Sequence, residues 1–408
     1  MKKEENDMNI NKVPKSELDS RLERFIGEID STYNEWEMCV ITGSVGMFYL
    51  TGTICDGLLL IRRGEGATLW VRRSYERCLL ESEFSDIRSM RSFRDIAGAV
   101  GVLPDTLYLD MAHASMEWYG IFSKYLKFKN LLPIDKVMLK TRSVKSEYEL
   151  ERMRISGSKT DLLLREALPH LLHEGISELE LYMDLYWVSV KNGHEGYSRF
   201  SMLNTDVSLG HVGFGDSPLY PSVFNGASGA QGLCPAVPAL GSRSRLLRNG
   251  DLVYVDICCC IDGYNTDKTL IYSFNDRQPD NVVHAHQHCL ALHRHAVSLL
   301  SPGTRPSDIY AEIMDMVLPE YKHNFMGAPG RTVPFIGHGV GLYVDEMPVI
   351  AKGFDTPLEN GMTIAIEPKI GIEGIGMVGS ENTYLVTDNG GESLTGECLE
   401  ILVVCDRN

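Results

Sequence analysis

Two aspartates lie in a stretch that reads as a β-hairpin, DLVYVDICCCIDGYNTDKTLIYSF. Runs rich in β-branched and aromatic residues flank Asp262-Gly263, a pair typical of a two-residue hairpin turn. With that turn, Cys258 pairs with Asp267, and Asp256 projects from the same face because side chains alternate along a strand. The two carboxylates are then diagonal neighbours, about 7–8 Å apart at the backbone. Such close negative charges indicate either a solvated surface or a site that binds a cation.

Three further stretches carry groups that could complete a metal site. GHGVGLYVDEMP presents His338 among glycines, where the backbone can approach a site closely. MTIAIEPKI presents Glu367 at the end of an apolar strand, and GSENTYLVT presents Glu381 at the start of another. Four carboxylates and one imidazole suit a pair of divalent cations bridged by carboxylates and a water molecule. The carboxylates favour manganese and the imidazole is compatible with zinc or iron, so the residue types leave the metal open.

A second group of potential ligands is the histidine-rich stretch VVHAHQHCLALHRHAVSLL, residues 282–300, which reads as a helix. Side chains two positions apart on a helix point in different directions, so HAHQH cannot converge on one ion. His284 and His288 are four positions apart, but no acidic partner accompanies them as in a zinc-binding helix. The pattern therefore predicts a polar helix face.

The amino-acid composition excludes some classes of binding partner. The 408 residues include 39 basic and 55 acidic ones, giving a net charge of −16. This acidity argues against a nucleic acid or an anionic membrane as partner. The polar N-terminus lacks the apolar segment of a signal peptide, and no apolar run reaches the roughly 18 residues of a membrane span. Ten cysteines are scattered without a CxxC pair, which favours free thiols. We therefore expect a soluble, cytoplasmic protein.

Length and patterning predict two domains. Residues 1–15 are predicted to be disordered, and a helix follows in SELDSRLERFIGEI. CVITGSVGMFYLTG, GLLLIRRGEGATLWV and DTLYLDMA read as strands of a small α/β domain. In KSEYELERMR, Ser146 stands ahead of three acidic residues, the pattern of a helix start. We therefore place the domains at 1–142 and 143–408.

In order and local context these stretches resemble the M24 metallopeptidases, which include methionine aminopeptidases, Xaa-Pro aminopeptidases, prolidases and creatinase. VDICCCIDGYNTDKT is similar to the family's D-x-G…GY-x-x-D-x-T stretch, with Cys258 in place of the glycine. GHGVGL matches G-H-G-x-G-L, GSENTYLVT matches I-E-[DN]-T-x-x-V-T, and AIEPKI matches the E-P-G stretch with Lys369 in place of glycine. The resemblance covers residues 145–408. FYLTG and KSEYELERMR resemble the creatinase/prolidase N-terminal domain.

This resemblance implies an α+β fold, with a creatinase-type N-terminal α/β domain followed by a C-terminal pita-bread domain. Carried over position by position, it assigns two divalent ions (Mn, Co, Zn or Fe) to Asp256, Asp267, His338, Glu367 and Glu381. It also makes Glu367 the general base, or the residue that orients a metal-bridging hydroxide. It favours the Xaa-Pro aminopeptidase and prolidase branch, whose substrates are small peptides. Because relatives commonly form dimers, it implies a homodimer.

The chain departs from the family in the histidines around the metal site. Asp345 stands where the peptidases have a histidine seven residues after the ligand histidine, and Pro334 replaces one four residues before it. The region ahead of the first aspartate also lacks the family's histidine. Asp345 is therefore a candidate catalytic and substrate-binding residue, with pairing to Lys369 or Arg331 as the alternative. His211, in SLGHVGFGD, either replaces a missing histidine in substrate binding or is an ordinary loop residue.

Three functional classes follow from these residues. The first is a dinuclear-metal-dependent hydrolase that cleaves an N-terminal X-Pro-type peptide bond by attack of a metal-bridging hydroxide. The second is a non-peptidase enzyme on the same fold, a creatinase-like C–N hydrolase or a lyase acting on a small molecule, which the replaced histidines favour. The third is a metal-binding protein without catalytic activity, which the five retained ligands argue against. We expect the first.

Overall fold

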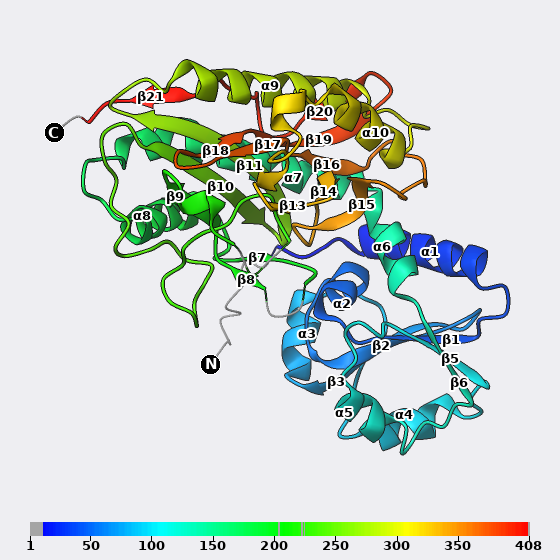
Figure 1. Cartoon of the computed structure of the whole chain (residues 1–408). Helices are drawn as coiled ribbons and strands as arrows, with labels where there is room; N and C mark the ends of the chain where they lie inside the picture. Colours follow the sequence, from blue (N-terminus) through cyan, green and yellow to red (C-terminus); the bar gives the residue numbers. More distant parts are fainter. Residues whose placement is uncertain (1–10, 203–204, 222, 224, 407–408) are drawn as a thin grey trace, which may run out of the picture. The chain divides into compact units, whose positions relative to one another are not determined.

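The computed structural model describes residues 11–202, 205–221, 223 and 225–406. The chain divides into two compact units, Met1–Arg142 and Ser143–Asn408. Each unit combines helices with a β-sheet (Figure 1). Among the described residues, no helix has both the length and the apolar character that a membrane crossing requires.

The first unit is built on one six-stranded mixed sheet. The strand order is β4 (Ile87–Ser89), β3 (Gly66–Arg73), β2 (Asp56–Arg62), β1 (Met38–Ile41), β5 (Thr106–Leu109) and β6 (Asn130–Pro133). β1, β2 and β3 pair antiparallel, whereas β4, β5 and β6 lie parallel to their neighbours. The helices are α1 (Lys15–Thr32), α2 (Ser44–Thr51), α3 (Tyr75–Glu81), α4 (Phe93–Val100), α5 (Met116–Phe122) and α6 (Asp135–Ser143).

Helix α2 corrects the prediction that the segment CVITGSVGMFYLTG forms strand. β1 ends at Ile41, and the carboxylate of Asp110 accepts hydrogen bonds from the N–H groups of Thr42 (2.9 Å) and Gly43 (2.6 Å). These bonds turn the chain out of the sheet and into α2. Six of the eight residues of α2 are buried. A short helix that is apolar on most sides has no periodicity to distinguish it from a buried strand.

The N-terminal prediction is corrected in part. Disorder was predicted for residues 1–15, of which residues 1–10 lie outside the described part of the chain. Beyond them, Val13 is buried and Lys15 already begins α1. The helix predicted in SELDSRLERFIGEI is confirmed, and its periodic residues Leu18 and Phe25 face the core.

The second unit is built on a nine-stranded sheet. Its main path runs through β15 (Glu346–Ala351), β14 (Phe335–Gly339), β16 (Thr363–Ile366), β19 (Glu381–Thr387), β11 (Tyr264–Phe274), β10 (Leu252–Ile261) and β9 (Gly210–Phe214), with β20 (Gly390–Ser393) on β19 and β21 (Leu402–Val404) on β11. Three two-stranded ribbons are β7 (Ser198–Arg199) with β8 (Asp206–Val207), β12 (Gly327–Ala328) with β13 (Arg331–Thr332), and β17 (Lys369–Ile372) with β18 (Gly376–Gly379). The helices are α7 (Glu147–Leu162), α8 (Glu178–Lys191), α9 (Asp280–Ser298) and α10 (Pro306–Met316), with short helical turns at Leu163–Ala167, Leu168–His170, Ser217–Leu219 and Pro319–Tyr321.

The hairpin strands of this sheet are covered on both faces. Leu252 and Tyr254 of β10 belong to the core shared with α9 and α10, whereas Val253 and Val255 belong to the core shared with α8. A strand covered on both faces reads as a continuous apolar run, because alternate residues enter different cores. Asp256 follows in the alternation and therefore lies on the face of Leu252 and Tyr254.

The predicted hairpin register is confirmed. β10 and β11 pair antiparallel, with Asp256 opposite Thr269. Asp262 and Gly263 have φ angles of 49° and 85°, the left-handed conformation that a type I′ turn needs at both positions. The carboxylate of Glu195 accepts hydrogen bonds from the N–H groups of both turn residues, at 2.6 and 2.9 Å. A charged acceptor therefore fixes the turn from outside the hairpin.

Helix α7 packs against the hairpin and begins at the predicted place. Ser146 and Glu149 form a capping box, each side chain accepting a hydrogen bond from the backbone N–H of the other. Ser156 Oγ donates a hydrogen bond to a backbone carbonyl of β10 at 2.6 Å. At Gly157, a Cβ atom would lie 2.0 Å from the backbone oxygen of Leu394. The absence of a side chain at Gly157 thus allows the close approach of α7.

Gly157→Ala should destabilise the protein by about 1–3 kcal/mol, because the added methyl group forces α7 away from a backbone carbonyl. Ser158→Ala is the matched control, since Ser158 is an exposed residue of the same helix. It should change the free energy of unfolding by less than about 0.5 kcal/mol. Denaturant unfolding of the full chain, followed by circular dichroism, measures both. Equal stability of the two variants would contradict this account of α7.

Candidate metal centre

The five predicted ligands come from neighbouring strands of the second unit. Asp256 lies on β10, Asp267 on β11, His338 on β14 and Glu381 on β19, and Glu367 follows β16. These strands are consecutive in the sheet, in the order β14, β16, β19, β11 and β10. Thr269 lies opposite both Asp256 and Glu381, so the side chains of these residues share one face. Residues more than a hundred positions apart in the sequence therefore meet.

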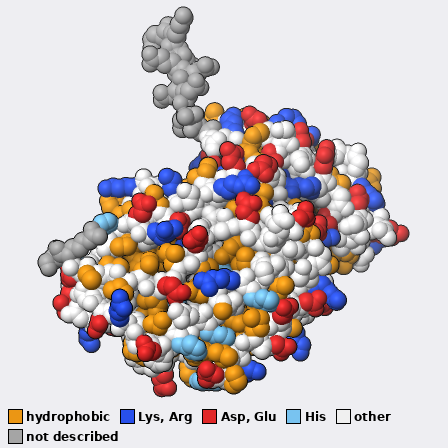
Figure 2. Space-filling model, turned by 90° about the horizontal axis from the view of Figure 1, so that it is seen from above, with side chains coloured by type: hydrophobic (Ala, Val, Ile, Leu, Met, Phe, Trp, Pro, Cys, Tyr) orange, Lys and Arg blue, Asp and Glu red, His pale blue; other side chains and the backbone are white. Residues whose placement is uncertain are grey.

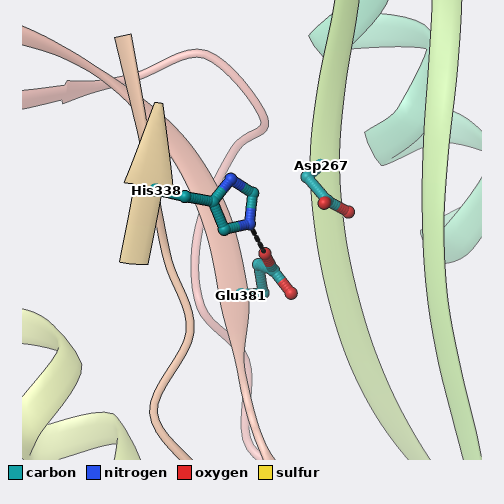
Figure 3. Close-up of side chains that lie close together, drawn as sticks. All are labelled: Asp267, His338 and Glu381. Carbon is teal, nitrogen blue, oxygen red and sulfur yellow. Dashed lines mark ion pairs between the residues drawn. The ribbon is translucent and has the colours of Figure 1, made fainter. Parts of the chain in front are cut away.

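Asp267, His338 and Glu381 form a group with metal-binding geometry. One ligand atom from each lies within 4.8 Å of the others. Figure 3 shows the imidazole of His338 directed at the carboxylate of Glu381, with Asp267 on strand β11 beside them. Glu381 and Asp267 are buried. An ion there would have carboxylate and imidazole ligands, a set that suits manganese, iron, cobalt or zinc.

A backbone contact orients the imidazole of His338. Its Nδ1 lies 3.1 Å from the carbonyl oxygen of Gly339. A carbonyl only accepts hydrogen bonds, so Nδ1 carries the proton in this contact. Burial acts to lower the pKa of His338, but Glu381, Glu367 and Asp267 outweigh it and raise that pKa to about 10. In the metal-free site Nε2 therefore also carries a proton, which a metal ion would displace. Nε2 lies 3.6 Å from one oxygen of Glu367 and 3.6 Å from one oxygen of Glu381.

Lys369 adds a cation that the sequence analysis did not assign to the site. Its Nζ lies 2.6 Å from Glu381 Oε2 and 3.0 Å from both Glu367 Oε2 and Asp256 Oδ2. The hydroxyl of Tyr254 donates a hydrogen bond to the same Asp256 oxygen at 2.7 Å. The alternation of side chains in β10 could have indicated Tyr254. In the sequence, the one signal for Lys369 was that it replaces the family's glycine two positions after Glu367.

The titration behaviour of the site reflects burial and excess negative charge. Burial raises the pKa of Glu367 to about 7, although Lys369 acts in the opposite direction. Burial would also raise the pKa of Glu381, but Lys369 and His338 outweigh it and lower that pKa to about 2. Burial, with the charges of Glu381 and Asp256, raises the pKa of Asp267. The carboxylates outnumber the ammonium groups, so a divalent cation fits the charge of the site.

Cys258, which pairs with Asp267 across the hairpin, also contacts its side chain. Its Sγ donates a hydrogen bond to Asp267 Oδ1 at 3.4 Å. Burial and the nearby carboxylates raise the pKa of the Cys258 thiol well above its usual range. A protonated thiol is a poor metal ligand, so Cys258 acts here as a hydrogen-bond donor.

Asp345 is held by Ser201 rather than by a basic residue. Its two carboxylate oxygens accept hydrogen bonds from the N–H (2.6 Å) and the hydroxyl (2.7 Å) of Ser201. The alternative pairings to Lys369 and Arg331 are not formed, since Lys369 contacts the carboxylates described above and Arg331 donates to backbone carbonyls. Burial raises the pKa of Asp345, and His338 is close enough to act against that shift. Ser201 therefore orients the carboxylate of Asp345.

His211 lies on strand β9, which corrects the alternative of an ordinary loop residue. It pairs directly with Asp256 of β10, so its side chain lies on the face that carries the metal group. It is buried, and this burial, with the charge of Lys369, lowers its pKa to about 3. His211 is thus a neutral imidazole beside the cluster at physiological pH.

The histidine-rich helix α9 does not form a second metal site among the described residues. Two of its histidines, His286 and His293, are buried, which corrects the prediction of a purely polar face. His286 contacts the backbone of Leu399 and Gly379, and His293 contacts the hydroxyls of Tyr384 and Ser380. Other histidine side chains are visible on the surface in Figure 2, among hydrophobic and charged ones.

Comparison with protein families identifies both parts of the chain. Residues 151–388 match metallopeptidase family M24, and residues 21–144 match the Creatinase/Prolidase N-terminal domain. The chain therefore belongs to metallopeptidase family M24, in the branch that carries this N-terminal domain. The family identifies it as a hydrolase of the metallopeptidase class.

Known relatives cover most of the chain. The Xaa-Pro dipeptidase of Pyrococcus furiosus is 26% identical over 394 residues, which span 94% of this chain and all of that protein. The probable dipeptidase PepE of Mycobacterium tuberculosis is 30% identical over 269 residues, 66% of this chain and 62% of that protein. Among solved structures, the prolidase from Pyrococcus horikoshii superposes with a TM-score of 0.77 at 22% identity, covering 94% of this chain and all of that one.

A protein that is not named as a peptidase shares the same fold. The N-terminal domain of the FACT complex subunit SPT16 from chickpea superposes with a TM-score of 0.72 at 11% identity, covering 96% of this chain and 99% of that one. These superpositions confirm the predicted fold, a creatinase-type domain followed by a pita-bread domain. Fold likeness at this level of identity leaves the reaction to be argued from the site.

Asp267→Asn should lower the affinity for a divalent ion by at least about tenfold, because a neutral amide replaces a carboxylate ligand. Isothermal titration with Mn²⁺ and with Zn²⁺, on full-length protein stripped by a chelator, measures the effect. Asp315→Asn, at an exposed position of α10, makes the same chemical change elsewhere and should leave the affinity unchanged. An Asp267→Asn protein that binds as tightly as the parent would remove Asp267 from the ligand set.

Proposed function

We propose that the chain is a metal-dependent peptidase that cleaves the N-terminal bond of short peptides, with X-Pro dipeptides as its first expected substrates. The observation that carries the proposal is the convergence of Asp267, His338 and Glu381 with a third carboxylate, Glu367. It is supported by the similarity over 94% of the chain to a protein named Xaa-Pro dipeptidase. All five predicted ligands belong to the second unit, 143–408, and we assign the chemistry to it.

In this proposal Glu367 is the general base. One of its oxygens lies 3.6 Å from His338 Nε2, beside the metal group. Burial raises the pKa of Glu367 in the metal-free site. A bound divalent ion would lower it again and leave an ionised carboxylate that can accept a proton. A divalent ion bound in this group would supply a Lewis acid for the carbonyl and lower the pKa of a water molecule.

Asp345 and His211 are the proposed substrate-binding residues. A carboxylate has about four acceptor positions, and the hydrogen bonds from Ser201 use two of them. The remaining positions of Asp345 suit a cationic group such as the free α-amine of a peptide. His211, on the opposite side of Asp256 from β11, presents a neutral imidazole.

A second candidate is a non-peptidase reaction on a small cationic molecule. Asp345 favours it, because a carboxylate cannot donate the hydrogen bond that the family's histidine gives to a developing tetrahedral centre. The negative charge of Asp345 would oppose an oxyanion and attract a substituted amine or guanidine. The predicted pair of ions, manganese content, homodimeric state and cytoplasmic location stay predictions.

Glu367→Gln should lower kcat by about 10²–10⁴-fold, because the amide cannot accept the proton. Glu392→Gln, at an exposed position of β20, is the matched control and should keep full activity. The assay uses X-Pro dipeptides, other dipeptides and creatine-like small molecules, each with Mn, Co, Zn and Fe. Hydrolysis of X-Pro peptides supports the peptidase, and turnover of the small molecules alone supports the second candidate. Failure to turn over either class in every metal would contradict both.

Asp345→Asn keeps the shape of the side chain and removes its charge. If Asp345 binds a cationic substrate group, the variant should lose about 1–3 kcal/mol of transition-state stabilisation, seen in kcat/KM. Acetylation of the substrate amine should remove the difference between variant and parent. Ser201→Ala, which keeps the charge and deletes one donor, should have a smaller effect. An unchanged rate and substrate ranking in Asp345→Asn would exclude this role.

A further inference from the structure

In each of the two glutamates of the site, the two carboxylate oxygens face different groups. Glu381 places Oε2 against Lys369 Nζ at 2.6 Å and Oε1 near His338 Nε2 at 3.6 Å. Glu367 repeats this arrangement, with Oε2 at 3.0 Å from Lys369 Nζ and Oε1 at 3.6 Å from His338 Nε2. Carboxylates arranged in this way bridge two cation positions. One position is bounded by His338 and Asp267, and the other contains the ammonium of Lys369.

The ammonium position has its own third carboxylate. Asp256 Oδ2 lies 3.0 Å from Lys369 Nζ, and Asp256, like Glu367, is a predicted ligand outside the group formed by Asp267, His338 and Glu381. A lysine ammonium has three N–H donors, and the three carboxylate oxygens can accept all of them. Lys369 therefore occupies the carboxylate oxygens that would otherwise be ligands of a second metal ion.

The backbone of Lys369 holds the side chain in this position. Lys369 begins β17, pairs with Gly379 of β18, and accepts a hydrogen bond from Met326 N at 2.7 Å. Its side chain is only 2% exposed, and its Nζ lies 5.8 Å from the centre of the Tyr254 ring. An ammonium leaving three carboxylates for an apolar interior would lose its charge partners and its hydration together, which is strongly unfavourable.

We propose that the ammonium of Lys369 takes the place of one of the two metal ions, so that the chain binds a single divalent ion at Asp267, His338, Glu381 and the facing oxygen of Glu367. This inference rests on the proposed function and replaces its predicted pair of ions. Lys369 is a positioning residue: it fixes the glutamates and balances charge, and its donors are already used by the protein.

The number of metal ions bound per chain shows whether the site has one metal position or two. The full-length parent, saturated with Mn²⁺ and freed of excess by gel filtration, should contain about one ion per chain by elemental analysis. Its electron paramagnetic resonance spectrum should be that of an isolated Mn²⁺ ion rather than a coupled pair. Lys369→Gly restores the family's residue and empties the second position, so it should bind about one ion more than the parent. Lys352→Gly, at an exposed lysine, is the matched control and should bind as the parent does.

The outcomes distinguish this inference from the proposed function. The role of Lys369 is overturned if the parent binds two ions per chain. It is also overturned if the parent binds one ion and Lys369→Gly binds no more than one. Either result leaves the metal-dependent peptidase standing. A parent that binds no ion, with one ion gained in Lys369→Gly, supports the substitution of metal by lysine and overturns the metal-dependent function. If Lys369→Gly does not fold, the count and spectrum of the parent decide alone: a coupled pair overturns the inference, and a single isolated ion supports it.

Discussion

The charge of four carboxylates, three of them buried and that of Asp256 half-buried, is the constraint on which this site depends. Asp256, Asp267, Glu367 and Glu381 lie on one face of the second sheet, where isolated anions would be strongly destabilised. In the folded state these groups are therefore neutralised by nearby cations or by bound protons. Lys369 supplies one of them from the chain itself, and the group around His338 has the ligands for a divalent ion. The same charge that would attract a metal ion also fixes how the glutamates point.

The sheet brings these side chains together because neighbouring strands come from distant segments of the sequence. β14, β16, β19, β11 and β10 are neighbours, although the segments that form them are separated by as many as about a hundred residues. Two supports hold the central hairpin: Glu195 fixes its turn, and Ser156 of α7 donates a hydrogen bond to the backbone of β10. Ligands placed on strands that are buried on both faces have little freedom to move, which suits a site whose geometry must be maintained before an ion or substrate arrives.

The substrate side of the site departs further from the family than the metal side. The ligand residues match the family positions, whereas Asp345 replaces a histidine and is oriented by Ser201. This exchange turns a donor into an acceptor and favours a cationic group on the substrate. A free peptide amine has such a charge, and so do small amines and guanidines. Membership of family M24 thus gives the class of reaction. In our proposals, Asp345 determines which substrate the chain prefers, and Lys369 determines how many metal ions it binds.

Local patterns in the sequence determined the hairpin, its register and its turn, since Asp262-Gly263 and two β-branched runs allow few alternatives. The order of acidic and histidine motifs was also enough to place the chain in its family. Tertiary structure decided the rest. The stretch after β1 became helix α2 because Asp110 turns the chain, and His286 and His293 are buried because the rest of the second unit covers one face of α9. Lys369 illustrates the difference most clearly. Its sequence position showed only a missing glycine, because the three carboxylates that surround it come from separate segments that meet only in the folded sheet.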